Sequence, residues 1–327
     1  MKQIPDIRTL KNILIMRPEG SLGDAIMSTC CYREIKRVNP SIKITVACFG
    51  NSYDFLKANP YIDEIFKIPI RTRIRRHQHW PTLIWTGLKL RRCHFDLVLD
   101  SCSKTALNYR LCKWLAAGGC LLDRFTSPVQ PFGAMNKHGS EHECSILRLL
   151  GIKNPSPHYD LPIPSADRQT ITAWLEQEKL DRFILFNPFG SVDKHSFNPQ
   201  TAEHLYKLLK TWNLPWVVPL APSSYERGKQ LLGRFPNVFI KQTKNVFELF
   251  ELVRRAQAVV TPDTSVVHIS TGFEKPCLTF YNTPTAYALP NNPKAHVIKT
   301  ALSDINTAID WHEVEQAIDQ IKHHLHP

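Results

Sequence analysis

The stretch Asn12–Cys30, NILIMRPEGSLGDAIMSTC, decides the fold. Its first five residues are an apolar run of the length of a buried strand, and its last six read as the start of a helix. A strand, a glycine-containing loop and a helix form the first unit of an open α/β sheet, in which ligands bind beyond the carboxyl ends of the strands. Beside Gly23 the loop presents the carboxylate of Asp24, which suits either a helix N-cap or a general base.

Alternating strand and helix patterns continue along the chain and predict a doubly wound parallel sheet. Apolar runs predict strands at 43–48, 96–99, 183–186, 216–219, 238–240, 258–260 and 277–280. Helical spacing is expected at 24–37, 141–150, 169–179, 201–212, 225–235, 246–256 and 304–324, and a helix opens at about 265. Ser140 with Glu143 three residues later is typical of a capping box at the start of the helix at 141–150.

Length and charge both indicate two domains. The chain has 327 residues, more than one core usually holds. The proline-rich segment 151–166 predicts a linker, so we expect domains at 1–165 and 166–327. The first part has 24 Lys and Arg against 13 Asp and Glu, and the second has 17 against 16. The first domain is therefore expected to face an acidic partner: nucleic acid, anionic lipid headgroups or a phosphorylated sugar.

Several classes of protein are disfavoured by the sequence. No apolar run is long enough for a membrane span, and the N-terminus lacks the features of a signal peptide. Nine cysteines without zinc-ligand spacing are expected to be reduced thiols in a cytoplasmic protein. No GxGxxG, GxxxxGK[ST] or GxSxG motif occurs, which argues against a dehydrogenase, a P-loop ATPase and an α/β-hydrolase.

An acid-free segment lies between two of the expected strands. Residues 71–92, RTRIRRHQHWPTLIWTGLKLRR, hold seven Lys and Arg, two His and several large apolar side chains. The segment suits a solvated basic loop followed by an amphipathic helix, and it equally suits an anion-binding surface near a membrane.

A second cluster of polar residues follows the strand at 258–260. Asp263-Thr264-Ser265-Val266-Val267-His268 joins a strand end to a helix start, where backbone N–H groups and the helix dipole favour an anion. A capping sequence with a core histidine would have the same residues. Lys194 follows another strand of this half, in the stretch Asn187–His195, so two strand-end loops could hold a diphosphate between them.

The order and spacing of these motifs resemble the lipopolysaccharide heptosyltransferases of glycosyltransferase family 9. The resemblance rests on the SxGD loop, the D-T-S-x-x-H-x-S turn, the stretch Asn187–His195 and the basic loop Arg71–Arg76. It implies a GT-B fold: two Rossmann-like α/β domains facing across a cleft, the first binding acceptor and the second nucleotide sugar. The last helix can return to the first domain in this arrangement. The turn departs from the family at Ser265, where glycine is frequent. Some members have glutamate in the loop after the strand at 216–219, where this chain has Ser223-Ser224-Tyr225-Glu226.

The resemblance also implies roles for individual residues. Asp24 matches the catalytic base, and no cofactor or metal is implied. The residues that match donor binding are Ser21, Gly23, Asn187, Lys194, Asp263, Thr264, Ser265, Val266 and His268. The residues that fall where acidic groups of the acceptor are held are Arg71, Arg73, Arg75, Arg76 and Lys104.

These matches predict an inverting, metal-independent transfer of heptose from ADP-L-glycero-D-manno-heptose to the Kdo/heptose inner core of lipopolysaccharide. The enzyme would be cytoplasmic and peripheral on the cytoplasmic face of the inner membrane, in contact with a Kdo–lipid A acceptor. One alternative is a related transferase with another nucleotide sugar or a protein acceptor. The net charge of +12 suggests an alternative of another class, a nucleic-acid-binding protein. The absence of a DNA- or RNA-binding motif from the sequence argues against this alternative.

Overall fold

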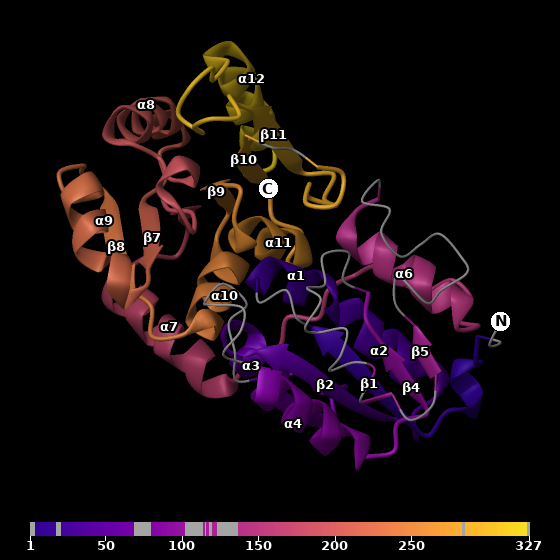
Figure 1. Ribbon diagram of the computed structural model, residues 1–327. Helices are drawn as coiled ribbons and strands as arrows, with labels where there is room; N and C mark the ends of the chain where they lie inside the picture. The colour runs from indigo at the N-terminus through magenta and orange to yellow at the C-terminus, as the bar shows by residue number, and fades with distance from the viewer. Residues whose placement is uncertain are drawn as a thin grey trace. The chain divides into compact units, whose positions relative to one another are not determined.

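The computed structural model describes residues 4–17, 21–68, 80–101, 114, 116–117, 120–122, 137–282 and 285–325. The chain divides into two compact units, Met1–Pro162 and Ile163–Pro327. Each unit contains one sheet of parallel strands flanked by helices, as Figure 1 shows. The domain bounds 1–165 and 166–327 expected from the sequence, and the binding roles of the two domains, stay predictions.

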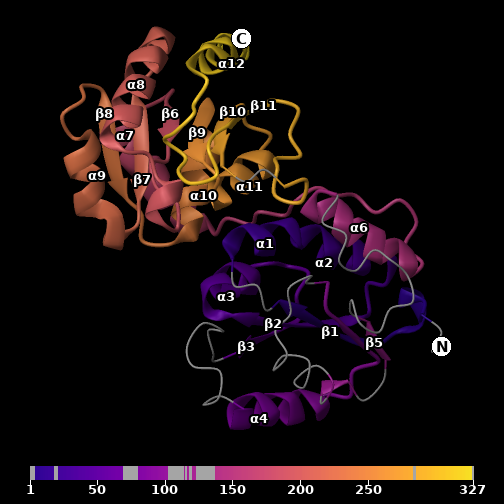
Figure 2. The ribbon, with the colours of Figure 1, turned by 45° about the horizontal axis from the view of Figure 1, so that its top comes forward.

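The first unit is built on a five-stranded sheet of order β3-β2-β1-β4-β5. Its strands are β1 (Asn12–Arg17), β2 (Lys43–Phe49), β3 (Glu64–Ile68), β4 (Leu97–Leu99) and β5 (Cys120–Leu122). Its helices are α1 (Leu22–Met27), α2 (Thr29–Val38), α3 (Gly50–Lys57), α4 (Trp80–Arg91) and α6 (Gly139–Leu149), with a short 3-10 turn η1 (Ile7–Thr9). Figure 2 shows α1, α2 and α6 along one face of this sheet and α4 along the other.

The central position of β1 follows from its sequence. Residues Ile13, Leu14, Ile15 and Met16 are fully buried, as expected for a parallel strand that is covered on both faces. β1 pairs with β2 on one side and with β4 on the other, so the strand order reverses here. Helix α1, which carries Asp24, thus follows the strand at the topological switch point, where open α/β sheets bind ligands.

The second unit is built on a six-stranded sheet of order β11-β10-β9-β6-β7-β8. Its strands are β6 (Ile184–Phe186), β7 (Trp216–Leu220), β8 (Val238–Gln242), β9 (Ala258–Pro262), β10 (Cys277–Tyr281) and β11 (Ala295–Lys299). Its helices are α7 (Ser165–Gln177), α8 (Pro199–Leu209), α9 (Tyr225–Leu232), α10 (Val246–Arg255), α11 (Ser265–Gly272) and α12 (Trp311–Lys322). Short 3-10 turns are η2 (Asp193–His195), η3 (Lys210–Trp212) and η4 (Pro222–Ser224). The switch point of this sheet lies between β6 and β9.

Two predictions for the first unit are wrong in detail. The helix expected at 24–37 is two helices separated at Ser28, whose hydroxyl donates to the carbonyl of Ala25. Such a local side-chain bond competes with a continuous helix. The helix predicted at 141–150 begins at Gly139 with His138 as its N-cap, so Ser140 and Glu143 do not form a capping box.

The structure also adds elements that the sequence does not predict. Strands β5 and β11 complete the two sheets at one edge each. The final helix begins at Trp311 rather than at 304, with Asp310 as its N-cap. Its apolar side chains Val314, Ile318 and Ile321 lie in the core of the second unit. In the part of the chain that the structure describes, no helix has the length and apolar character needed to cross a membrane.

Candidate functional site

The loop after β1 places Asp24 in the first turn of α1. Ser21 is the N-cap of this helix, because its hydroxyl accepts from the backbone N–H of Asp24 at 3.2 Å. The N-cap interpretation of Asp24 is therefore wrong. The carboxyl of Asp24 lies at the positive end of the helix dipole, which favours its ionised form. Gly23 is buried in the same turn.

A buried ion pair lies at the end of β1, next to this loop. Arg17 Nη1 is 2.9 Å from Glu143 Oε1, and both side chains are 4% exposed. Arg17 also donates to the hydroxyl of Ser101, which in turn donates to Glu143 Oε1 at 2.8 Å. On the other side, Arg17 Nε donates to the Tyr32 hydroxyl at 3.3 Å. The pair ties the ends of β1 and β4 to α2 and α6, and motif-based reasoning missed it because its members are far apart in sequence.

In the second unit, hydrogen bonds join the ends of β6 and β9. Asn187 follows β6 and is buried, and its Nδ2 lies 2.9 Å from Thr261 Oγ1 and 3.2 Å from Thr264 Oγ1. The two threonine hydroxyls are 3.0 Å apart. The predicted residues Asn187 and Thr264 thus meet at the switch point of this sheet, and Thr261 is the link that the sequence did not reveal.

The same bonds fix the start of α11. Thr264 is its N-cap, with the hydroxyl accepting from the N–H of Val266 at 3.2 Å. Ser265 is the first helical residue, so its N–H has no acceptor inside the helix. Val266 and His268 are buried, whereas Ser265 is half-buried. The turn therefore offers a helix N-terminus suited to an anion, on a support of buried threonine and asparagine.

Asp263 lies just before this helix and has an altered acidity. Burial raises the pKa of its carboxyl from 3.8 to about 6, and a hydrogen bond with the Tyr281 side chain acts in the opposite direction. Its backbone N–H donates to Phe280 of β10, which fixes the turn against the sheet. A carboxyl of this kind takes up a proton close to neutral pH, which is frequent in functional sites.

Lys194 is held by a compact loop between β6 and α8. Ser196 Oγ accepts from the N–H of Gly190 at 3.1 Å, and a Cβ on Gly190 would lie 2.4 Å from the carbonyl oxygen of His195. The loop therefore closes only with glycine at 190. Lys194 is exposed and forms no ion pair with the described residues. Its ammonium is available for an anionic ligand.

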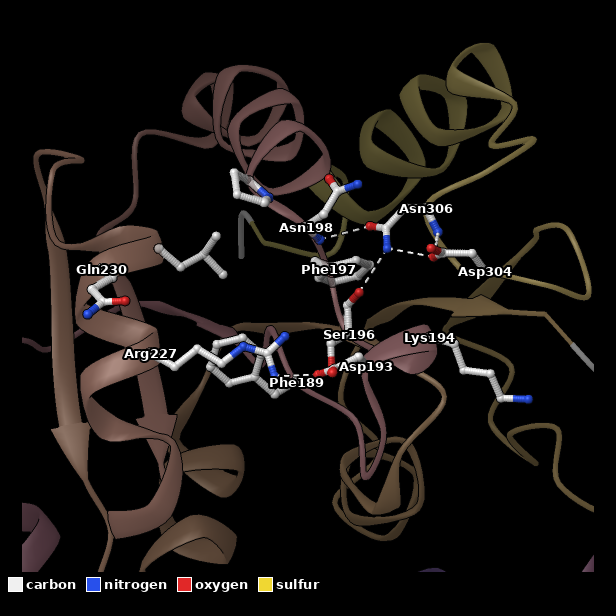
Figure 3. Close-up of a pocket in the computed structure, with 12 residues that line it drawn as sticks. Phe189, Asp193, Lys194, Ser196, Phe197, Asn198, Arg227, Gln230, Asp304 and Asn306 are labelled. Carbon is white, nitrogen blue, oxygen red and sulfur yellow. Dashed lines mark hydrogen bonds and ion pairs between the residues drawn. The ribbon is translucent and has the colours of Figure 1, made fainter.

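A pocket of about 470 Å³ lies beside this loop and is shown in Figure 3. Arg227 of α9 stacks over Phe189, with its Cζ atom 4.5 Å from the centre of the ring. Its Nη1 atom forms an ion pair with Asp193 Oδ1 at 2.8 Å. On the opposite wall, Asn306 donates to the carbonyl of Ser196 at 2.9 Å. Lys194 also lines the pocket and points away from the Arg227–Asp193 pair (Figure 3). Thr264 and its neighbours are not among the lining residues. No sequence motif predicts the residues that line this pocket, because they come from three distant segments of the chain.

The predicted acceptor residues cannot be placed. Arg71, Arg73, Arg75, Arg76 and Lys104 all lie outside the described residues. Their roles stay predictions. Ser21, Gly23 and Asp24 are placed within the first unit, and their roles in donor binding and catalysis also stay predictions.

Comparison with known proteins identifies the family of the chain. The model of glycosyltransferase family 9 (heptosyltransferase) matches residues 143–315, more than half of the chain. A protein of Escherichia coli (strain K12) named "Putative lipopolysaccharide heptosyltransferase 4" is 23% identical over 297 residues, which are 85% of this chain and 76% of that protein.

Solved structures show the same fold over nearly the whole chain. A family 9 glycosyltransferase from Veillonella parvula DSM 2008 has a TM-score of 0.77 and 15% identity, covering 98% of both chains. E. coli heptosyltransferase WaaC with ADP has a TM-score of 0.72 and 18% identity, covering 95% of this chain and 99% of that one. E. coli ADP-heptose lps heptosyltransferase II has a TM-score of 0.67 and 16% identity, covering 96% and 98%. The expected GT-B class, with two Rossmann-like domains, is confirmed. Because the family model matches more than half of the chain, the chain belongs to glycosyltransferase family 9, the heptosyltransferases.

Proposed function

We propose that this glycosyltransferase moves heptose from ADP-L-glycero-D-manno-heptose to the Kdo/heptose inner core of lipopolysaccharide, with inversion and without a metal ion. One observation carries the proposal: the bonds of Asn187 with Thr261 and Thr264 hold an open helix N-terminus at the switch point of the second sheet. A nucleoside diphosphate suits this position, since N–H groups and a positive helix end both favour phosphate. The neighbours named as WaaC complexes with ADP and with ADP-2-deoxy-2-fluoro heptose support that choice of ligand.

In the proposed reaction Asp24 is the general base. Its carboxylate takes the proton of the acceptor hydroxyl while that oxygen forms a bond to the anomeric carbon of the heptose. The bond between the anomeric carbon and the β-phosphate oxygen breaks on the opposite face, so ADP leaves and the configuration is inverted. The position of Asp24 beyond a central strand, at a helix start, favours an ionised and accessible carboxylate.

The second unit would stabilise the charge that develops on ADP. The N–H of Ser265 and the helix dipole of α11 provide fixed positive potential, and the exposed ammonium of Lys194 adds a full charge. Together they would do what a divalent cation does in metal-dependent transferases. Asp263 would adjoin the same anion, and its proton uptake near pH 6 would lower repulsion there.

The first unit would hold the acceptor at the cytoplasmic face of the inner membrane. Its excess of positive charge suits Kdo carboxylates and lipid A phosphates, and Arg binds such groups in a bidentate manner. Arg71, Arg73, Arg75, Arg76 and Lys104 are the proposed contacts. The nucleic-acid alternative gains no support from the described residues, because the features of the second unit suit a small anionic ligand.

Direct transfer tests this function. Purified protein is mixed with ADP-heptose and Kdo-lipid A in EDTA, and the glycolipid product is identified by mass spectrometry. We expect a mass increase of one heptose and release of one ADP for each product formed. Transfer from a different nucleotide sugar alone, or to a protein alone, would contradict the proposal, as would activity that chelation removes and Mg²⁺ restores.

A further inference from the structure

The outward side of helix α4 is apolar, which reverses the usual pattern of a surface helix. Ile84, Trp85 and Leu88 are 37%, 60% and 47% exposed. At 100° per residue these three side chains fall within an arc of about 100° on one face. Leu90 lies on the opposite face, where it is buried in the core under the sheet with Leu14 and Val98. A helix that packs by one face normally presents polar residues on the other.

Positive charge borders this apolar face. Lys89, Arg91 and Arg92 are exposed at the end of α4, and Lys89 Nζ lies 5.2 Å from the centre of the Trp85 ring. The sequence has no Asp or Glu between Glu64 and Asp96, and it has eight Lys and Arg there. The surface of α4 therefore combines the exposed Trp85 ring and two aliphatic side chains with three exposed cations, for which the described residues provide no ion pair.

We propose that this face of α4 docks the enzyme on an anionic lipid bilayer, with the helix lying in the plane of the interface. Trp85 would sit at headgroup level, Ile84 and Leu88 would enter the acyl boundary, and the cations would contact lipid phosphates. The inference deepens the proposed function, whose acceptor is membrane-anchored, by naming the docking surface. A second copy of the chain is the poorer occupant, because a two-fold contact would bring like cations together.

Vesicle co-sedimentation tests the docking surface. The full chain is mixed with vesicles of phosphatidylcholine containing phosphatidylglycerol, and separately with phosphatidylcholine alone. We expect binding to the anionic vesicles that added salt weakens, and a fall of about tenfold or more for Trp85→Ser/Leu88→Ser. Leu88→Ser alone should give a smaller loss in the same direction. Leu302→Ser is the matched control, since Leu302 is 72% exposed in the second unit, and it should bind as the wild type does.

Other outcomes would overturn the inference. Equal binding of the wild type and both α4 variants would do so, as would absence of wild-type binding to anionic vesicles. A dimer that the α4 variants convert to monomer, with vesicle binding unchanged, would assign the face to a second copy. Transfer of heptose to a delipidated, water-soluble acceptor separates the two proposals. The α4 variants should retain that activity. Absence of that activity in the wild type would contradict the proposed function, whereas the vesicle experiment alone decides the docking surface.

Discussion

Arg17 Nη1 and Glu143 Oε1 lie 2.9 Å apart, and the two side chains are among the most deeply buried charges of the first unit. Arg17 is the last residue of β1, and Asp24 is reached within the following loop and helix turn. The second oxygen of Glu143 has no hydrogen-bond partner among the described residues. The Glu143 carboxylate therefore depends on its bonds with Arg17 and Ser101 to offset the cost of its burial.

Loss of the Glu143 charge should destabilise the first unit. Glu143→Gln removes the negative charge of this buried pair, a change that typically costs about 3–5 kcal/mol. Urea unfolding measures the difference. Glu203→Gln is the control, since Glu203 forms exposed ion pairs with Lys207 and Arg234, and it should leave the unfolding midpoint nearly unchanged. Equal stability of the Glu143 variant and the wild type would show that the pair does not hold the fold.

The hydroxyl of Thr264 should matter more than its methyl group. Thr264→Val removes the N-cap of α11 and one hydrogen-bond partner of Asn187, so we expect about 1 kcal/mol lower stability and roughly tenfold weaker ADP binding. Thr264→Ser keeps the oxygen and should bind ADP nearly as the wild type does. Isothermal titration with ADP compares the three proteins. The same affinity in the valine variant would remove this turn from the donor site.

Stability should depend on pH through Asp263. Burial raises its pKa from 3.8 to about 6, so the folded state holds the proton more tightly than the unfolded chain. The contribution of this carboxyl to stability therefore falls as pH rises between these values and is least favourable above about pH 6. Asp263→Asn should be more stable than the wild type near neutral pH, by up to about 3 kcal/mol at 1.36 kcal/mol per pKa unit.

The gap between the Asp263 variant and the wild type should close as the pH approaches 4. Urea unfolding across this range is the measurement, with Asp54→Asn, an exposed site on α3, as the control. A gap that stays constant with pH would show that the Asp263 carboxyl titrates normally in the folded protein.

Acceptor binding should depend on a few of the arginines at 71–76. Removing one charge-assisted contact costs roughly 1.5–3 kcal/mol, or about 10- to 150-fold in acceptor affinity. Arg71→Ala, Arg73→Ala, Arg75→Ala and Arg76→Ala should raise the acceptor KM unequally and leave the donor KM unchanged. Steady-state kinetics with each substrate varied in turn separates the effects, and Arg234→Ala serves as an exposed control in the second unit. An unchanged acceptor KM in all four variants would place the acceptor elsewhere.

The sequence was most informative where strands are buried on both faces. The runs at 12–16, 183–186 and 258–260 became β1, β6 and β9, which carry the two switch points. Strands β5 and β11 have little periodicity, and pairing at a sheet edge rather than local pattern makes them strands. Ser140 and Glu143 misled the cap assignment because the carboxylate pairs with Arg17, a contact over 126 positions that no local rule anticipates.

The site shows the same division between local and long-range information. Short motifs predicted Asp24 and the turn at 263–268 as site residues and placed both at helix starts, because a helix start after a strand is a local feature. Thr261, Arg227 and Asn306 carry no motif, and they are brought to their places by strand order and by loops from separate parts of the chain.

The most direct test of the account is the turnover of Asp24→Asn with ADP-heptose and Kdo-lipid A. If Asp24 is the general base, the amide cannot accept the proton, and kcat should fall by about 10²-fold or more. The dissociation constant for ADP should stay close to that of the wild type, since the second unit holds the donor, and Asp54→Asn should keep full activity. Near-normal kcat in Asp24→Asn would contradict the account and leave this carboxylate with a structural role alone.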